Sequence, residues 1–326
     1  MKYSIIFPGQ GSQSLGMLSD LNKNFSVVSE VFQEASDSIN VDLWKILNED
    51  QEALNLTENT QPIMLAAGYA TYKVLSEEAY LSPVSMAGHS LGEYTALVAS
   101  NTINFFDATR LVKKRGELMQ AAVPSGTGSM AAILGLDDSI IVEICQKASN
   151  KGVVEAVNFN SPGQVVIAGE KNAVTHACDL MKEAGAKRAL ILQVSVPSHC
   201  SLMKKAAAKF KTYIKSVDFK TGNVKVVHNV DADYAGNVEV IKNKLVEQLH
   251  MPVLWTDSVN KMKESGVERL IEVGPGKVLT GLTRRIDKSL SASAIIDVSS
   301  LKSTIEEISN ARWKISSCHW RIERHW

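Results

Sequence analysis

The chain contains the stretch Val84-Ser85-Met86-Ala87-Gly88-His89-Ser90-Leu91-Gly92. Its first four residues form a short apolar run of the kind that makes a buried strand, and the residues from Glu93 to Ser100 favour a helix. Two glycines frame a serine between these elements, where side chains at positions 88 and 92 would crowd a sharp bend. The stretch therefore predicts a strand, a tight turn and a helix, which is the setting of a nucleophile elbow.

Short apolar segments alternate with long helical stretches along most of the chain. The predicted strands are 4–7, 84–87, 224–227 and 269–273, and the predicted helices include 59–78 and 104–122. Pro62 suits the first turn of the earlier helix, whereas Pro124 and Gly126 stop the later one. This alternation indicates a parallel sheet covered by helices, and thus an α/β core.

The pattern changes after the segment from Pro124 to Gly128. Strands are predicted at 130–136, 153–158, 164–168 and 188–194, and helices at 139–148 and 173–183. The order β-α-β-β-α-β is that of a ferredoxin-like module. We therefore expect a small ferredoxin-like domain at 127–196, inserted into a catalytic core made of 1–126 and 197–310. Residues 311–326 lack any periodicity and are expected to form an atypical tail outside the core.

The composition excludes several classes of protein. The 326 residues are 45% hydrophobic and 21% charged, and 35 basic residues balance 35 acidic ones, so the chain as a whole has no nucleic-acid-binding signature. No apolar run is long enough to cross a bilayer or to act as a secretory signal, so we expect a cytoplasmic protein. The cysteines are too scattered for a zinc site or a disulfide framework, and we expect them to be reduced and buried or idle: Cys145, Cys178, Cys200 and Cys318.

Ser90 is the candidate nucleophile. A bare G-x-S-x-G pattern is weak support, but the strand before it and the helix after it strengthen the interpretation. The backbone N–H of Leu91 stands at the first turn of the helix, where it would point toward a developing oxyanion.

A nucleophilic serine needs a base, and seven histidines compete for the role. His89 adjoins Ser90 in the tight turn, where its side chain should diverge from the hydroxyl, so packing or substrate contact suits it better. His199 follows Val196-Pro197-Ser198 at a turn where the chain re-enters the core, and it is the best candidate. An uninvolved core histidine remains the alternative. The other histidines lie in less suitable places: His176, His228, His250, His319 and His325.

A third member of a triad is missing from the sequence. The aspartates between Ser90 and His199 open a helix or belong to the inserted module: Asp107, Asp137, Asp138 and Asp179. None of them is placed to orient His199, so a neutral carbonyl is the remaining partner for its Nδ1–H.

Seven motifs together resemble the malonyl-CoA:acyl carrier protein transacylases of bacterial fatty acid synthesis. They occur in family order over residues 1–300, whereas the tail from Ala311 does not resemble the usual family ending. The motifs are Phe7-Pro8-Gly9-Gln10-Gly11-Ser12-Gln13, Gly88-His89-Ser90-Leu91-Gly92-Glu93, Arg115-Gly116-Glu117-Leu118-Met119-Gln120, Asn158-Phe159-Asn160-Ser161-Pro162-Gly163-Gln164, Val196-Pro197-Ser198-His199, Gln248-Leu249-His250-Met251-Pro252-Val253-Leu254-Trp255 and Glu272-Val273-Gly274-Pro275-Gly276.

The resemblance implies an α/β-hydrolase-like core and a role for each site residue. It makes Ser90 the nucleophile and His199 the base, with the N–H groups of Gln10 and Leu91 forming the oxyanion hole. It also makes Arg115 the partner of the malonyl carboxylate, and Gln248 the residue whose carbonyl orients the histidine. Without the resemblance, Gln10 is only a turn glutamine, and Arg115 belongs to a basic run of a kind that is usually a solvated helix face.

The implied activity is transfer of malonyl from malonyl-CoA to the phosphopantetheine thiol of acyl carrier protein by a ping-pong mechanism. It requires no metal or other cofactor, and a monomer is expected. Three alternatives stay open: a serine thioesterase or lipase-like hydrolase using the same two residues, a transacylase for another extender unit, and a carrier-protein-binding module with a decayed site.

Overall fold

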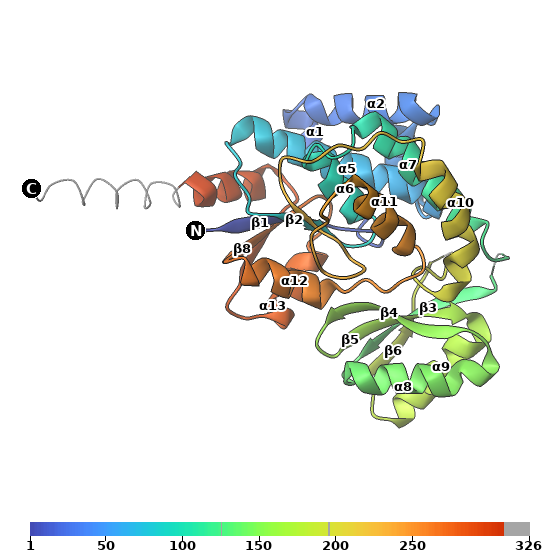
Figure 1. Ribbon diagram of the computed structural model, residues 1–326. Coiled ribbons are helices and arrows are strands. Elements are labelled where there is room, and N and C mark those ends of the chain that lie inside the picture. The colour runs from blue at the N-terminus through green and yellow to red at the C-terminus, as the bar shows by residue number, and fades with distance from the viewer. Residues whose placement is uncertain (125, 195, 310–326) are drawn as a thin grey trace, which may run out of the picture.

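The computed structural model describes residues 1–124, 126–194 and 196–309. Within these ranges the chain forms two β-sheets, each covered by helices (Figure 1). The predicted tail at 311–326 lies outside the described residues, together with Cys318, His319 and His325. The domain limits at 127, 196 and 310 remain a prediction.

The larger sheet is parallel and has the strand order β7-β2-β1-β8-β9. Ile5 of the central strand β1 pairs with Met86 on one side and Ile271 on the other. Because the strands are parallel, their carboxyl ends meet at one edge, which is where α/β proteins place their sites. The strands are β1 Tyr3–Phe7, β2 Met86–Gly88, β7 Val226–Val227, β8 Arg269–Val273 and β9 Ser291–Ile295.

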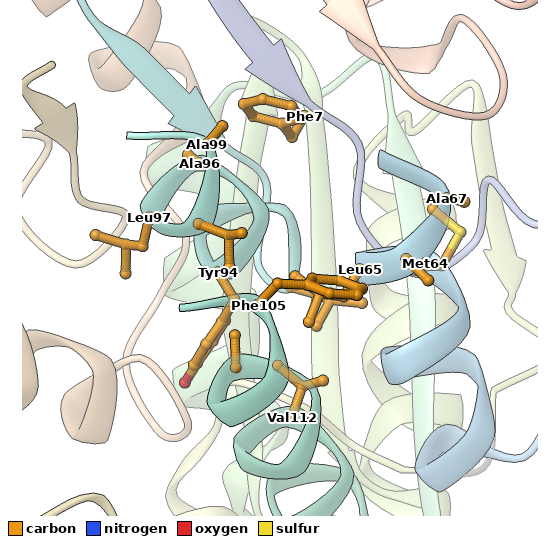
Figure 2. Packing of buried hydrophobic residues seen from close by; sticks show 14 of the residues in the cluster. Phe7, Met64, Leu65, Ala67, Tyr94, Ala96, Leu97, Ala99, Phe105 and Val112 are labelled. Carbon is orange, nitrogen blue, oxygen red and sulfur yellow. The ribbon is translucent and has the colours of Figure 1, made fainter. Parts of the chain in front are cut away.

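Both faces of the strands β1, β2 and β8 are buried, which explains why these strands read as apolar runs rather than alternating ones. Ile5 and Phe7 point into one hydrophobic cluster, and Ile6 between them points into another. Figure 2 shows the first cluster, in which Phe7, Leu65 and Tyr94 come from a strand and two helices. Full burial of each such apolar side chain contributes about 1.5–3 kcal/mol to stability.

Helices cover the two faces of the larger sheet. The long helix α5 packs against α2, α6 and α7 on one side, while α12 and α13 contact each other on the side of the second cluster. A further helical segment occupies 298–309. The helices of this part are α1 Ser19–Asn24, α2 Val27–Ile39, α3 Leu43–Glu49, α4 Gln51–Leu54, α5 Thr57–Glu78, α6 Gly92–Ala99, α7 Phe105–Gln120, η2 Ser201–Met203, α10 Lys204–Ile214, α11 Val238–Glu247, α12 Trp255–Glu264 and α13 Val278–Ile286.

The smaller sheet is antiparallel and has the order β4-β5-β3-β6, the ferredoxin-like arrangement that the sequence predicts. Ile133 and Ile167 face the helices α8 and α9, whereas Met130 and Val166 on the opposite face pack with Cys200. That opposite face therefore meets the segment that carries His199. The elements are β3 Gly128–Leu134, α8 Asp138–Ala148, η1 Ser149–Lys151, β4 Val154–Ser161, β5 Gln164–Glu170, α9 Lys171–Glu183 and β6 Arg188–Ile191.

The predicted α/β class is confirmed, and local details differ. Helix α5 begins at Thr57 rather than at Asn59, so Pro62 lies beyond the first turn and removes one intrahelical hydrogen bond. Strand β6 ends at Ile191 instead of Val194, because the N–H of Val194 turns back to the carbonyl of Leu192. Strand β9 was not predicted, since Ser291–Ile295 is rich in serine and alanine rather than β-branched residues.

Among the helices of the described residues, none is both long and apolar enough to traverse a lipid bilayer.

Candidate active site

The turn that carries Ser90 joins β2 to α6 at the carboxyl edge of the larger sheet. Ser90 has a φ of 52°, a left-handed conformation that costs a non-glycine residue about 1–2 kcal/mol. A Cβ on Gly88 would lie 1.9 Å from the carbonyl carbon of Gly92, and a Cβ on Gly92 would lie 2.1 Å from the carbonyl oxygen of Phe7. Both positions therefore require glycine, and the tight packing that they permit holds the serine in its strained conformation.

His199 lies next to Ser90, as the sequence predicts for the base. Its Nε2 lies 2.7 Å from Ser90 Oγ, and its Nδ1 lies 2.6 Å from the backbone carbonyl oxygen of Gln248. A carbonyl oxygen can only accept, so Nδ1 carries the proton and Nε2 is left to accept the serine proton. The ring is thus oriented by a neutral carbonyl, and no carboxylate among the described residues contacts it.

Burial keeps the His199 imidazole neutral. The residue is 2% exposed, and burial lowers its pKa to about 3, with the positive charge of Arg115 as the next largest cause. The hydrogen bond to Gln248 acts in the opposite direction but is weaker. A base with this pKa is in its proton-accepting form throughout the neutral range.

Arg115 lies in the same pocket and is 1% exposed, although Lys113 and Lys114 before it in the basic run are partly exposed. Its Nη2 donates to Gln248 Oε1 at 3.0 Å, and its guanidinium carbon lies 5.4 Å from the centre of the Tyr94 ring. Within the described part of the chain its Nε has no hydrogen-bond partner. Burial lowers the pKa of Arg115. A buried guanidinium with a spare donor is a receptor for an anionic group.

Gln10 and Leu91 stand beside the nucleophile. Leu91 precedes the first residue of α6, so its N–H is one of the unpaired donors of a helix start. No atom of the described residues accepts from the backbone N–H of Gln10 or of Leu91. The Gln10 side chain donates to Thr57 Oγ1 at 3.3 Å. Two free N–H groups beside a serine hydroxyl have the composition of an oxyanion hole.

A cavity of about 100 Å³ connects these groups. Ser90, His199 and Arg115 line one part of it, and the other wall comes from the side of the smaller sheet, including Met130 and Leu192. The cavity therefore lies between the two sheets and is lined by a charged group as well as by apolar side chains.

Sequence reasoning missed Asn229, which directly supports the turn. Its Oδ1 accepts from the N–H of Ser90 at 2.7 Å, and its Nδ2 donates to the carbonyl oxygen of Gly88 at 2.8 Å. Asn229 follows β7 at the carboxyl edge of the sheet, and that position was the only signal that could have found it.

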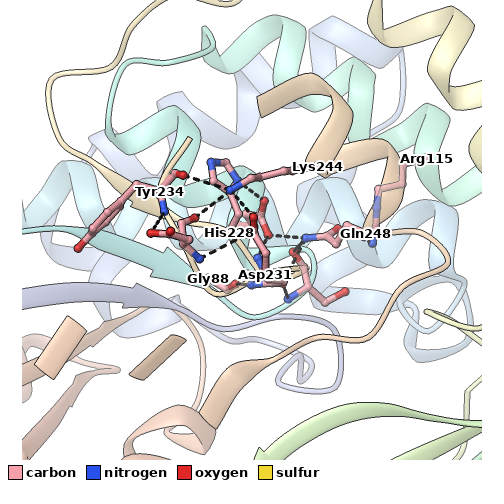
Figure 3. A network of polar contacts seen from close by, with 11 residues as sticks. Gly88, Arg115, His228, Asp231, Tyr234, Lys244 and Gln248 are labelled. Atoms are coloured by element: carbon pink, nitrogen blue, oxygen red, sulfur yellow. Dashed lines mark hydrogen bonds and ion pairs between the residues drawn. The ribbon is translucent and has the colours of Figure 1, made fainter. Parts of the chain in front are cut away.

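Glu93 and His228 were also missed. Both are buried, and His228 Nδ1 lies 2.8 Å from Glu93 Oε1 beneath the turn. Figure 3 shows this polar network, with Gln248 placed between Arg115 and the group around His228. Lys244 of α11 holds the loop after His228 by bonding Asp231.

Among the described residues, the remaining histidines and cysteines carry no comparable arrangement. His89 turns away from the hydroxyl, as expected, and bonds Asn160 Oδ1 at 2.8 Å while still lining the cavity. Burial lowers the pKa of His89. The thiols of Cys145 and Cys200 are buried and free, and burial raises the pKa of each to about 12, which makes them poor nucleophiles. The described residues contain no group of side chains suited to a metal ion.

A parallel α/β sheet that presents a serine on a strained turn against a buried histidine defines the serine hydrolase and acyl-transfer class of enzymes. Comparison with known families narrows the class. The family model for the acyl transferase domain matches residues 4–311 of the sequence, so the chain belongs to the acyl transferase domain family.

Individual relatives agree with this assignment. The chain is 52% identical over 306 residues to the malonyl CoA-acyl carrier protein transacylase of Escherichia coli (strain K12), covering 94% of this chain and 99% of that protein. It is 42% identical over 309 residues to the protein of the same name from Bacillus subtilis (strain 168), with 94% and 97% covered.

Solved structures give the same result. The crystal structure of an acyl carrier protein S-malonyltransferase from Vibrio cholerae O1 superposes with a TM-score of 0.90 at 51% identity, covering 93% of this chain and all of that one. A malonyl-transacylase in complex with its type II PKS acyl-carrier protein superposes with a TM-score of 0.93 at 51% identity, covering 94% and 100%. The resemblance found in the sequence is thereby confirmed.

Proposed function

We propose that this protein transfers malonyl from malonyl-CoA to the phosphopantetheine thiol of acyl carrier protein, and so supplies malonyl-acyl carrier protein for fatty acid synthesis. The observation that carries the proposal is a serine–histidine pair in one cavity with a buried arginine that has a spare donor. The names of relatives about half identical to this chain support the same donor and acceptor.

In the first half-reaction, Ser90 Oγ attacks the thioester carbonyl of malonyl-CoA while its proton passes to His199 Nε2. The tetrahedral oxyanion accepts hydrogen bonds from the N–H groups of Gln10 and Leu91. The carbon–sulfur bond then breaks, the imidazolium returns the proton to the departing sulfur, and coenzyme A leaves. The product is a malonyl ester of the serine.

In the second half-reaction, the phosphopantetheine thiol of the carrier protein enters the same site. His199 takes its proton, the sulfur attacks the ester carbonyl, and Ser90 leaves as the alcohol with that proton. The carbonyl of Gln248 holds the imidazole in the tautomer that both steps require. Neither half-reaction calls for a metal or redox cofactor.

Arg115 is the proposed partner of the malonyl carboxylate. A guanidinium offers a planar fork of donors that a carboxylate matches with two hydrogen bonds. One hydrogen bond to a charged group contributes about 1.5–3 kcal/mol, or roughly ten- to 150-fold, so Arg115 accounts for most of the preference for malonyl over acetyl.

The proposal also gives the protein's setting. We place it in the cytoplasm as a monomer whose partners are malonyl-CoA and acyl carrier protein, with no nucleic acid or membrane partner. Light scattering of the purified protein, alone and with carrier protein, tests the oligomeric state and the complex.

Mass spectrometry of the intact protein after mixing with malonyl-CoA tests the chemistry. We expect one malonyl adduct on the wild type and none on Ser90→Ala. Coenzyme A release without carrier protein separates transfer from hydrolysis: a single stoichiometric burst supports transfer, whereas sustained turnover supports a thioesterase. Absence of any adduct on the wild type would leave only a carrier-binding module.

A further inference from the structure

The side-chain amide of Gln248 connects Arg115 to the polar groups beneath the Ser90 turn, whereas the backbone carbonyl of the same residue bonds His199. Its Oε1 accepts from Arg115 Nη2 at 3.0 Å. Its Nε2 donates to Glu93 Oε2 at 2.8 Å and to the carbonyl oxygen of Ser90 at 3.0 Å, with Asn229 Oδ1 as a longer third contact at 3.2 Å. The residue is 0% exposed, so water does not compete for these bonds. Figure 3 shows the amide between Arg115 and the buried network.

The amide works in only one orientation. Arg115 offers nothing but donors, so it requires the oxygen end of the amide, and the acceptors on Ser90 and Glu93 require the nitrogen end. A reversed amide would set its NH₂ against the guanidinium and its oxygen against three other oxygens, those of Ser90, Glu93 and Asn229. The acceptors beneath the turn therefore determine whether Arg115 has a partner.

Glu93 is the strongest of these acceptors. It is 0% exposed in the first turn of α6, and both of its oxygens are occupied. Oε1 lies 2.8 Å from His228 Nδ1. Oε2 accepts hydrogen bonds from the N–H of Asn229 at 2.9 Å and from Gln248 Nε2. A carboxylate this deeply buried persists only when it is fully hydrogen-bonded, and charged acceptors bond about twice as strongly as neutral ones.

We propose that Glu93 is a positioning residue for substrate selection: it fixes the Gln248 amide, which in turn holds the guanidinium of Arg115 at the acyl pocket. Glu93 touches neither Ser90 Oγ nor His199, so it acts through the amide and not on the reacting atoms. The proposal rests on the proposed function, because it concerns the carboxylate end of the malonyl group.

The test compares kcat/KM for malonyl-CoA and acetyl-CoA in Glu93→Met and Glu93→Gln. Methionine keeps the volume but has no acceptor for Gln248, and we expect the malonyl-to-acetyl ratio to fall about tenfold, the lower range of one charged hydrogen bond. Glutamine keeps the ratio close to wild type, because its oxygen can face Gln248 and Asn229 while its NH₂ donates to a His228 that has changed tautomer.

Two further variants separate positioning from general damage. Glu272→Met is the matched control: Glu272 is also 0% exposed, accepts from the N–H groups of Leu279 and Thr280 at the start of α13, and shares no hydrogen bond with the amide of Gln248. It should lose stability and keep the ratio. In an Arg115→Ala background, Glu93→Met should leave the ratio unchanged, because the group through which it acts is already absent.

If Glu93→Met does not fold, Gln248→Met carries the same test, since its backbone carbonyl still orients His199 and only the amide is lost. A wild-type ratio in the folded Glu93→Met or Gln248→Met variant overturns the positioning role. So does an equal fall in Glu272→Met. A wild type that transfers no malonyl overturns the proposed function itself, and the two failures are thus distinguishable.

Discussion

Arg115 and His199 share one buried pocket, and the guanidinium of the first helps to keep the imidazole of the second uncharged. Burial is the largest cause of the lowered pKa of His199, which is about 3, and the charge of Arg115 is the next. The group proposed to bind the substrate carboxylate thus also adjusts the proposed base. Binding of a carboxylate at Arg115 would neutralise that charge and raise the proton affinity of His199 when it must accept a proton.

The first prediction concerns the pH dependence of Ser90 acylation. Because the pKa of His199 is about 3, the single-turnover rate should stay level as pH falls through 6.5, where an ordinary histidine would lose half of its base form. Arg115→Ala should move the inflection upward toward 6.5. Rapid-quench measurements from pH 4 to 8 check both, and a wild-type inflection near 6.5 would contradict the pKa assignment.

The same pKa predicts acid sensitivity of the fold. Between pH 6.5 and 3 the unfolded chain protonates this histidine while the native state does not, so the unfolded state binds more protons and stability falls as pH decreases. The contribution is at most about 1.4 kcal/mol per pH unit in that window. Urea titrations at several pH values give the free energy of unfolding as a function of pH. This free energy should fall less steeply with decreasing pH in His199→Ala than in the wild type.

Substitution of the buried arginine should change selectivity more than reactivity. Arg115→Ala is expected to lose malonyl transfer by about ten- to 150-fold and to retain or gain acetyl transfer. Lys114→Ala, one position earlier on α7 and paired with Glu117 at the surface, is the control and should alter neither. An equal fall for both acyl groups in Arg115→Ala would refute the carboxylate role.

Loss of the asparagine beneath the turn should slow acylation without touching the reacting groups. Asn229→Ala removes the acceptor for the Ser90 N–H and the donor to Gly88, and we expect about tenfold slower acylation and about 2–3 kcal/mol lower stability. Asn237→Ala removes a helix cap at the start of α11 instead, so it should lower stability with normal acylation. Rapid-quench experiments measure the acylation rate and urea titrations the stability of each variant. Normal acylation in Asn229→Ala would contradict its role beneath the turn.

Glycine substitutions distinguish the turn from ordinary positions. Gly88→Ala should destabilise the protein by more than about 3 kcal/mol, because its Cβ would overlap the Gly92 backbone. Gly281→Ala, in helix α13 with nothing within 4 Å of the added Cβ, should stabilise it by about 0.5–1 kcal/mol. Thermal unfolding measures both, and a fully stable Gly88→Ala would show that the turn can relax.

The sequence predicted what depends on local chain geometry. Gly88, Ser90 and Gly92 lie within five positions, so the strand, turn and helix could be inferred from spacing, and the second sheet followed from its element order. The choice of His199 needed only its place after a turn, although its distance from Ser90 came from the structure.

Residues that act through long-range contacts could not be predicted in this way. Glu93 resembles any acidic residue in a first helical turn, and Asn229 any polar residue after a strand. Their partners lie 135 or more positions away in the chain, as with His228 for Glu93 and Ser90 for Asn229. Arg115 was singled out only by family resemblance, because its burial depends on how α7 packs against the rest of the core.

The walls of the proposed acyl pocket come from separate parts of the chain. Met130, Leu192 and Val194 belong to the portion folded around the antiparallel sheet, while Ser90 and Arg115 precede that portion and His199 follows it. One uninterrupted stretch of coding sequence thus shapes much of the space available to the acyl group. Exchanging that stretch between homologues could therefore let the enzyme accept larger acyl groups, while Ser90, Arg115 and His199 stay unchanged.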